Sequence, residues 1–157
     1  YDQCVGADIF TKPSAVLPNL PFTLRNLVIA GETIRPGEFK EIDINIARLP
    51  SHTQIDTPIY VSRAVEDGPV LALMAGMHGD EINGMEIVRR ILDQGFHHVK
   101  RGTVVCIPII NVYGFLNFSR DVPDGKDVNR SFPGSRKGSL ASRVAYHMTH
   151  EVIPNID

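Results

Sequence analysis

The stretch MHGDEINGME, residues 77–86, holds a histidine and a glutamate three positions apart, His78 and Glu81. At the start of a helix, this spacing can direct an imidazole nitrogen and a carboxylate oxygen to one point. Both groups are suitable zinc ligands, and a catalytic zinc usually has three protein ligands and an open position for water. The alternative is structural: Asp80 caps the helix, Glu81 favours its positive end, and His78 is incidental. The spacing alone leaves both interpretations open.

A second set of groups that can bind anions lies in NFSRDVPDGKDVNRSFPGS, residues 117–135. An arginine guanidinium binds a carboxylate through two parallel hydrogen bonds, so Arg120 and Arg130 can hold a substrate carboxylate or polarise a scissile carbonyl. Asn129 can donate to the same oxygens, and Asp127 can orient an arginine or a metal-bound histidine. The alternative is an ordinary solvated loop in which PDG forms a β-turn.

The pattern of apolar residues predicts the elements that position these groups. Residues 70–76 and 103–110 are continuously apolar, as in strands that are buried on both faces. Between them, apolar residues at helical spacing predict a helix that ends at Gly95. Strand, helix and strand in this order predict a crossover in a mainly parallel or mixed sheet. Because ligands bind at the carboxyl ends of such strands, His78 and Glu81 are expected at a ligand site.

The first part of the chain differs in character. Residues 1–37 are rich in proline and glycine, which predicts an irregular lead segment. Alternating apolar and polar residues predict short strands at 39–49 and 57–65, and EDGP at 66–69 predicts a turn. We therefore expect a lead segment with a small antiparallel β unit over residues 1–66.

The last part of the chain predicts a long loop and a helix. Residues 111–138 are polar and contain many glycine, proline, aspartate and asparagine residues, and a loop of this length inside a domain is usually functional or disordered. A helix is expected from an N-cap at Ser139 to Pro154, with its apolar residues on one face. Residues 67–157 thus form a second unit, of class α/β with flanking helices.

Composition limits the class of function. The net charge is -2 and the sequence pI is near 6.3, so no basic surface is expected for nucleic acid or an anionic membrane. No apolar run approaches the roughly 18 residues of a membrane-spanning helix. The two cysteines, Cys4 and Cys106, are too few for a disulfide framework, and Cys106 lies in an apolar run as a buried thiol. The first ten residues lack the pattern of a signal peptide, so we expect a cytoplasmic location.

Three segments, taken together, resemble a known family. They are HGDEING, NVYGFLNFSRDVPDGKDVNRSFPGS and GSLASRVAYH, and in this order and spacing they are similar to the succinylglutamate desuccinylase/aspartoacylase family of zinc amidohydrolases. These enzymes are relatives of the zinc carboxypeptidases. The resemblance covers roughly residues 67–153. It implies a zinc carboxypeptidase-like fold, a Zn²⁺ cofactor and a small N-acyl amino acid-like substrate, with 67–157 as the N-terminal part of the catalytic domain.

The resemblance also implies roles for individual residues. His78 and Glu81 match the first two zinc ligands of the family. Arg120 matches the catalytic arginine that contacts the substrate and stabilises the oxyanion of the tetrahedral intermediate. Asn129 and Arg130 match the pair that binds the substrate carboxylate.

Two acidic residues complete this comparison. Asp127 matches a supporting acid of the family. Asp121 stands where relatives often carry an aromatic residue, and this difference bears on the preference for the acyl group.

The family's third zinc ligand is a histidine on the next strand, and its general base is a glutamate much further along. Neither is matched here, so we expect the chain to be the N-terminal part of a larger enzyme, with an incomplete fold of its own. His147 and His150 are expected on a solvated helix surface, and three other histidines sit in or near turns without ligand spacing: His52, His97 and His98.

Three functions follow as hypotheses. The first is a zinc-dependent deacylase that hydrolyses the amide bond of an N-acyl amino acid. The second is a metallocarboxypeptidase, which shares the ligands and the Asn-Arg pair. The third is a non-catalytic binding module with the same fold. By itself, the 157-residue chain is expected to be inactive, to hold metal weakly or not at all, and to associate with other chains through an exposed part of the sheet.

Overall fold

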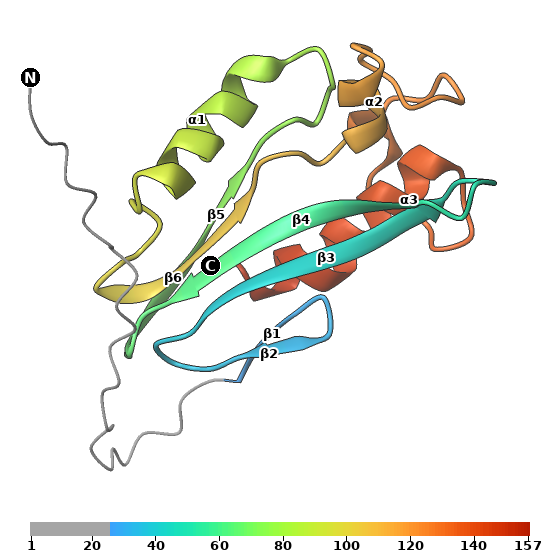
Figure 1. The fold of residues 1–157 in the computed structure, drawn as a ribbon. Helices are drawn as coiled ribbons and strands as arrows, with labels where there is room; N and C mark the ends of the chain where they lie inside the picture. Colours follow the sequence, from blue (N-terminus) through green and yellow to red (C-terminus); the bar gives the residue numbers. More distant parts are fainter. Residues whose placement is uncertain (1–25) are drawn as a thin grey trace, which may run out of the picture.

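The computed structural model describes residues 26–157, in which four strands form one mixed sheet (Figure 1). The expectations for residues 1–25, including Cys4, lie outside the described residues. The strands stand in the order β3-β4-β6-β5, with only β5 and β6 parallel to each other. Their bounds are β3 Phe39–Arg48, β4 Gln54–Arg63, β5 Glu66–Met74 and β6 Arg101–Ile107. The expected α/β fold with a mixed sheet is confirmed.

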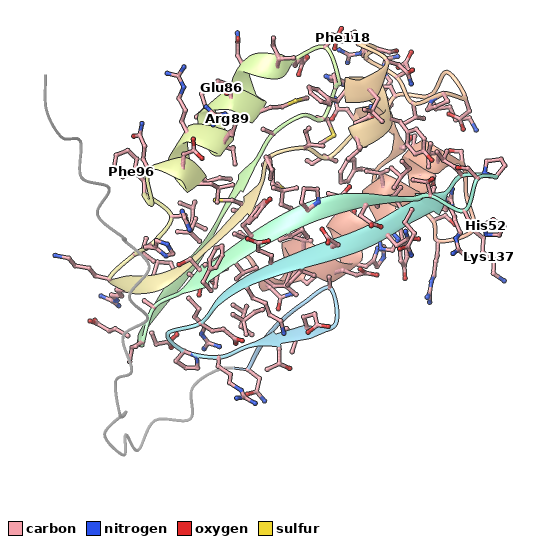
Figure 2. The ribbon with its side chains drawn as sticks, in the orientation of Figure 1. His52, Glu86, Arg89, Phe96, Phe118 and Lys137 are labelled. Carbon is pink, nitrogen blue, oxygen red and sulfur yellow. The ribbon has the colours of Figure 1, made fainter. Side chains whose placement is uncertain are left out.

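The predicted crossover connects the parallel pair. Helix α1, Ile82–Asp93, lies between β5 and β6 in the chain and packs on one face of the sheet (Figure 1). It buries Met85 and Val88, and it ends before Gly95, whose φ of 71° is the left-handed conformation expected after a helix. Its outer face is charged: Figure 2 shows Glu86 and Arg89 there, joined by a 2.7 Å ion pair. The helix prediction is confirmed.

The opposite face of the sheet is covered by elements from both ends of the described chain. Helix α3, Leu140–His147, packs there together with a hairpin of strands β1, Leu27–Ile29, and β2, Glu32–Ile34. Because β6 is covered on both faces, side chains on both of its faces are buried, and they point alternately into two cores. Val105 and Ile107 join the larger core, and Val104 and Cys106 join the smaller core under α1. This explains the continuous apolar run.

Burial also makes the single described cysteine thiol unreactive. Cys106 is fully buried, as the sequence predicted, and burial raises the pKa of its thiol to about 11. The reactive thiolate form is therefore disfavoured near neutral pH.

Two predictions about the first half were wrong. Residues 27–34 form the β1–β2 hairpin instead of an irregular segment. Residues 66–69 belong to β5 rather than to a turn: Glu66 pairs with Arg101, and the register shifts before Val70 pairs with Thr103. A Gly-Pro pair is typical of turns, but here it accommodates an irregularity within a strand.

Strand β5 is also less buried than its sequence suggested. It lies at the edge of the sheet, and Leu71 is 55% exposed although Val70 is buried. A run of apolar residues cannot distinguish an edge strand from a central strand, because both have the same composition. The sheet is nonetheless continuous across residue 66, since β4 pairs with β6. The domain boundary at that residue stays a prediction.

The C-terminal helical region follows its prediction closely. The Ser139 side chain accepts a hydrogen bond from the Ser142 backbone N–H and caps α3. The helix continues as a π-helical turn, Met148–Val152, and a 3-10 turn, Ile153–Asn155. The long polar loop before it contains helix α2, Val112–Leu116, and a 3-10 turn, Asn129–Ser131. No helix within residues 26–157 is long and apolar enough to cross a membrane.

Several of the histidines outside the motif pack against other aromatic rings. The His97 ring is buried and lies 3.9 Å from the His98 ring, with Phe39 packed against both. Burial, with repulsion from His98, holds the pKa of His97 below its ordinary value of 6.5. His150 is exposed and stacks on Tyr146, as expected of a surface residue.

His147 corrects a sequence prediction. Its side chain is only 17% exposed, and its Nδ1 lies 3.0 Å from Oε1 of Glu151, in the π-helical turn that follows α3. The flank of the α3 surface is thus covered rather than solvated.

A close contact between the backbones of two loops fixes the position of the histidine motif. Gly79 lies against the peptide that joins Gly114 and Phe115, and its backbone N–H donates to Ser119 O at 3.0 Å. A Cβ at position 79 would overlap that peptide. Glycine is required here because of contact between two backbones, since the neighbouring atoms are main-chain atoms that cannot rotate away.

We therefore expect Gly79→Ala to lower the free energy of unfolding by about 1–3 kcal/mol, the usual result of forcing extra volume into a packed region. Urea unfolding measures it. Gly84→Ala is the matched control, because its new Cβ would meet only the Ala75 side chain at 3.3 Å inside a helix. Equal stabilities of the two variants would contradict the close approach.

Candidate active site

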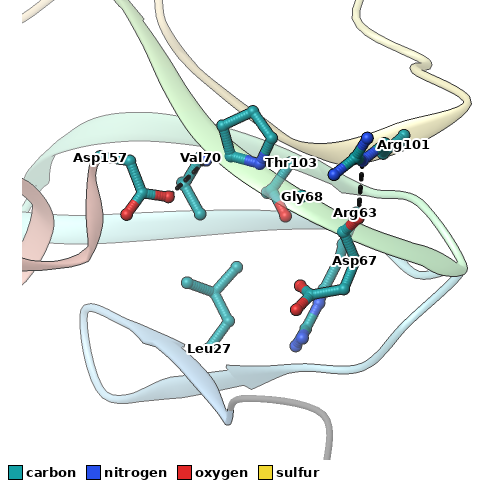
Figure 3. A pocket seen from close by; sticks show the side chains of 9 residues that line it. Leu27, Arg63, Asp67, Gly68, Val70, Arg101, Thr103 and Asp157 are labelled. Carbon is teal, nitrogen blue, oxygen red and sulfur yellow. Dashed lines mark hydrogen bonds between the residues drawn. The ribbon is translucent and has the colours of Figure 1, made fainter. Parts of the chain in front are cut away.

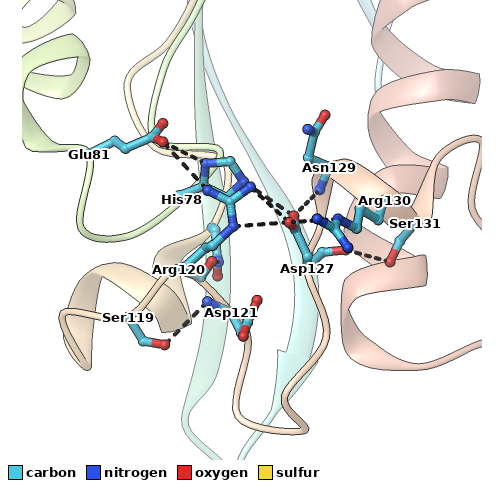
Figure 4. A network of polar contacts seen from close by, with 10 residues as sticks. His78, Glu81, Ser119, Arg120, Asp121, Asp127, Asn129, Arg130 and Ser131 are labelled. Atoms are coloured by element: carbon cyan, nitrogen blue, oxygen red, sulfur yellow. Dashed lines mark hydrogen bonds and ion pairs between the residues drawn. The ribbon is translucent and has the colours of Figure 1, made fainter.

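The predicted site residues gather at the carboxyl ends of β5 and β6 (Figure 4). His78 follows β5, and the loop that carries Arg120 follows β6 and α2. Backbone hydrogen bonds continue between the two segments beyond the strands, from Asn111 N to Gly76 O at 2.8 Å and from Ile110 N to Ala75 O at 3.0 Å. Parallel pairing therefore delivers both chain segments to the same edge of the sheet.

His78 lies between two carboxylates. Its side chain is 8% exposed, with Nδ1 2.8 Å from Glu81 Oε1 and Nε2 3.2 Å from Asp127 Oδ1. The Glu81 side chain is 60% exposed, so its carboxylate reaches the surface at this point. Helix α1 begins immediately after Glu81. The chain therefore turns between His78 and Glu81, and this turn brings the carboxylate back to the imidazole ring. The two groups thus converge, as the spacing predicted.

The structural alternative for this motif is wrong in its assignment of the helix cap. The N-cap position of α1 is Glu81, and no side chain caps the helix through a hydrogen bond. Asp80 is exposed and does not serve as the cap. The Glu81 carboxylate contacts His78 and so does not serve the helix end alone.

Asp127 is the centre of the network. Its side chain is 10% exposed, and one oxygen, Oδ2, accepts from Arg120 Nε at 3.1 Å and Nη2 at 3.0 Å. The other oxygen, Oδ1, accepts from the Asn129 backbone N–H at 2.8 Å and faces His78. Burial raises the pKa of Asp127, but the hydrogen bonds from Arg120, Asn129 and His78 outweigh that effect and hold it below 3.8. The carboxylate is therefore charged at neutral pH.

The two arginines differ in how firmly they are held. Arg120 Nη1 points toward Glu81, 3.9 Å from its Oε1, while the rest of the guanidinium binds Asp127. Arg130 is 84% exposed and only approaches Asp127, at 3.7 Å. Asn129 is anchored through its backbone and has an exposed side chain. Arg120 is thus fixed beside Glu81, and Arg130 is available to a ligand.

An open pocket of about 490 Å³ adjoins these arginines. Its lining combines basic and acidic side chains from one loop: Arg120, Asp121, Lys126, Asp127, Arg130 and Ser131. His78 and Glu81 lie beside this pocket rather than in its wall, joined to it through Arg120 and Asp127.

Sequence reasoning missed residues that hold this loop. Asn111 is buried, its side-chain oxygen accepts from the Gly114 N–H at 2.8 Å, and its amide donates to Arg120 O at 3.3 Å. Ser131 donates to the backbone carbonyl of Asp127 at 2.8 Å. A polar residue directly after an apolar strand was the signal for Asn111, since such a residue sits where a strand meets a site. No comparable signal marked Ser131.

The donor atoms suit a zinc ion in part. An imidazole nitrogen and a carboxylate oxygen converge, and Asp127 holds the other nitrogen of the ring, as carboxylates do for metal-bound histidines. Within residues 26–157, no His, Cys, Asp or Glu completes a group of three that could hold a metal. The described residues therefore fit two of the ligands of a zinc site.

A second hollow, of about 500 Å³, opens at the other end of the parallel strands (Figure 3). It is lined by the starts of β5 and β6 and contains Arg101, which donates to Asp67 O, and Asp157, which accepts from Val70 N. This hollow is separate from the network around His78.

Known proteins resemble this chain in sequence and in fold. A model of the succinylglutamate desuccinylase/aspartoacylase catalytic domain matches residues 67–157. The N-alpha-acetyl-L-2,4-diaminobutyric acid deacetylase of Halomonas elongata is 32% identical over 101 residues, which are 64% of this chain and 29% of that protein. The chain thus spans less than a third of this relative.

Two solved structures have the same fold over most of the chain. An aspartoacylase family protein from Mesorhizobium loti is 26% identical with a TM-score of 0.67, covering 78% of this chain and 39% of its own. A succinylglutamate desuccinylase/aspartoacylase from Rhodobacter sphaeroides is also 26% identical with a TM-score of 0.67, covering 83% and 42%. With the match of the catalytic domain over residues 67–157, the chain belongs to the succinylglutamate desuccinylase/aspartoacylase family.

Proposed function

We propose that the protein containing this chain is a zinc-dependent amidohydrolase that removes the acyl group from an N-acyl amino acid. The observation that carries the proposal is the convergence of His78 Nδ1 and Glu81 Oε1, 2.8 Å apart, with Arg120 Nη1 3.9 Å from the same carboxylate oxygen. A metal-ligand pair and a fixed cation at one point suit a reaction in which negative charge develops on a carbonyl oxygen. The relative from Halomonas elongata is a deacetylase, which supports an amide as the bond that breaks.

His78 and Glu81 would supply two of the zinc ligands, and a third would come from a part of the protein outside residues 26–157. When bound, zinc supplies a Lewis acid that polarises the scissile carbonyl and activates water. Asp127 holds His78 Nε2 at 3.2 Å and so keeps the other nitrogen directed toward Glu81. The second carboxylate thus orients a ligand without binding the metal itself.

Arg120 would stabilise the intermediate. Water adds to the acyl carbon, the carbonyl oxygen becomes an oxyanion, and the carbon–nitrogen bond then breaks. The departing nitrogen takes up the protons that the attacking water gives up, leaving a carboxylate and a free amino acid with its ammonium group. Because Asp127 holds two guanidinium nitrogens of Arg120, Nη1 is positioned before the charge develops, which is the arrangement that lowers a barrier most effectively.

Arg130 and Asn129 would bind the carboxylate of the amino acid. Arg130 is exposed and lines the same pocket as Arg120, so a substrate in that pocket can contact both arginines. Its contact with Asp127 is long enough, at 3.7 Å, for the guanidinium to turn toward a stronger partner. Substrate binding and charge stabilisation would thus belong to two different arginines.

The zinc proposal is tested with the full-length protein. We expect His78→Ala to lose tightly bound zinc and turnover together, because the variant lacks one of the two donors that converge at this point. Metal content after dialysis and hydrolysis of a panel of N-acyl amino acids and C-terminal peptides are the measurements. His150→Ala, an exposed histidine on the C-terminal helical turn, is the matched control.

Zinc at wild-type stoichiometry in the His78 variant would refute the ligand assignment. A wild-type protein that binds zinc and cleaves only peptides would favour a carboxypeptidase, and one that cleaves neither would favour a binding module.

The two arginine roles predict different kinetics. Arg130→Ala should mainly raise KM, because it removes binding that is equal in the ground and transition states. Arg120→Ala should mainly lower kcat, by about a hundredfold, because its contact strengthens only as charge develops. Arg136→Ala, an exposed arginine later in the same loop, should change neither constant by much. The reverse pattern in steady-state kinetics would show that the roles are exchanged.

The contacts of Asp127 predict that one substitution lowers both stability and activity. Asp127→Asn keeps the shape of the side chain but removes the charge that Arg120 and the Asn129 N–H require, so we expect the free energy of unfolding to fall by about 2 kcal/mol. The kcat should fall as well, because Arg120 loses its support. Asp124→Asn on the same loop is the control. A variant as stable and active as the control would show that Asp127 does not position Arg120.

A further inference from the structure

The pocket beside Arg120 contains an acidic group that the proposed reaction does not use. Two of its lining side chains are acidic, Asp121 and Asp127, and three are basic, Arg120, Lys126 and Arg130. A pocket that only bound the carboxylate of a substrate would need the basic groups alone. The position of Asp121 therefore requires a separate explanation.

The two carboxylates of the pocket differ in what they already bind. Asp127 accepts hydrogen bonds from Arg120 and Asn129 and faces His78 and Arg130, so its charge is compensated inside the protein. Among residues 26–157, no hydrogen bond or ion pair involves the Asp121 carboxylate: its single hydrogen bond runs from its backbone N–H to Ser119 Oγ, at 3.2 Å. An uncompensated carboxylate in a pocket is a binding group for a cation.

The backbone around Asp121 holds it in place. The Val122 N–H donates to Lys126 O at 3.1 Å and the Gly125 N–H to Val122 O at 2.9 Å, which closes a tight turn. Asp121 and Asp127 flank this turn on either side. Figure 4 shows Asp121 directly after Arg120, on the Ser119 side of the network. A ligand between Arg120 and Arg130 therefore has Asp121 as a neighbour in the same pocket wall.

We propose that Asp121 is the residue that selects the substrate, by pairing with a cationic group on its side chain. The inference rests on the proposed function and names its substrate class: N-acyl amino acids whose side chain ends in an amine. The carboxylate of such a substrate binds Arg130, its acyl group lies toward Arg120, and its side-chain ammonium binds Asp121. This pairing would explain why Asp121 stands at a position where relatives often carry an aromatic residue.

The experiment compares isosteric substrates with the full-length protein. Nα-acetyl-L-2,4-diaminobutyrate and Nα-acetyl-L-norvaline differ by an ammonium and a methyl group at the end of the same side chain. Nα-acetyl-L-ornithine and Nα-acetyl-L-norleucine repeat the pair with one more carbon. We expect the wild type to prefer the amine of each pair. In Asp121→Asn, kcat/KM for the amines should fall roughly ten- to a hundredfold, the value of a hydrogen bond to a charged group, with the neutral isosteres nearly unchanged.

Two further variants separate pairing from other effects. Asp124→Asn removes the same charge from the same turn but outside the pocket lining, and should leave the preference intact. Asp121→Lys should shift the preference toward Nα-acetyl-L-glutamate. An equal loss for both members of a pair, or no loss for either, in Asp121→Asn would overturn the proposal.

Binding keeps the inference testable if the proposed reaction fails. Should the wild type hydrolyse neither these amides nor any member of the N-acyl amino acid panel, the proposed function fails, and calorimetric titration with free L-2,4-diaminobutyrate and L-norvaline decides the role of Asp121. Tighter binding of the diamino acid by the wild type, lost in Asp121→Asn and retained in Asp124→Asn, supports the pairing. Equal binding of the two amino acids by the wild type overturns it.

Discussion

The Asp127 carboxylate is the group on which the geometry of the site depends. It is nearly buried, and a nearly buried charge is stable only when donors surround it. Those donors come from separate segments: His78 after β5, Arg120 after α2, and the Asn129 N–H at the start of a 3-10 turn. Because one carboxylate must satisfy all of them, the segments cannot move independently. The requirement to compensate one charge thereby fixes a histidine and an arginine that are far apart in the sequence.

The sheet brings these segments within reach of Asp127. Strands β5 and β6 are parallel, so the residues that follow them emerge at one edge. Backbone hydrogen bonds beyond the strands and the contact of Gly79 with the Gly114–Phe115 peptide then hold the two following loops together. Side-chain geometry at the site is therefore set by contacts between main chains, which tolerate little displacement. Such a scaffold suits catalysis, because misplacement of a charged group by a fraction of an ångström weakens its effect.

The charges of the site are divided by how strongly the protein already holds them. Arg120 is fixed by Asp127, whereas Arg130 and the Asp121 carboxylate remain available to a ligand. A fixed group can stabilise charge that appears only during a reaction, because its orientation costs nothing at that moment. An available group contributes to binding, since a ligand replaces water around it. The proposed division between stabilising the reaction and recognising the substrate follows from this difference in restraint.

Neighbouring residues alone were enough to predict the local elements and the chemistry of the motif. Helical spacing identified α1 and the Ser139 cap, alternation identified β3, and the turn of chain between His78 and Glu81 made their convergence predictable, because these depend on neighbouring residues. The sequence did not show that β5 is an edge strand, that residues 66–69 continue it, that residues 27–34 form a hairpin, or that His147 is covered. Each depends on partners distant in the chain. The links from Asp127 to His78 and from Asn111 to the Arg120 carbonyl likewise arose only in the tertiary structure, because hydrogen bonds between segments are fixed by packing and not by spacing.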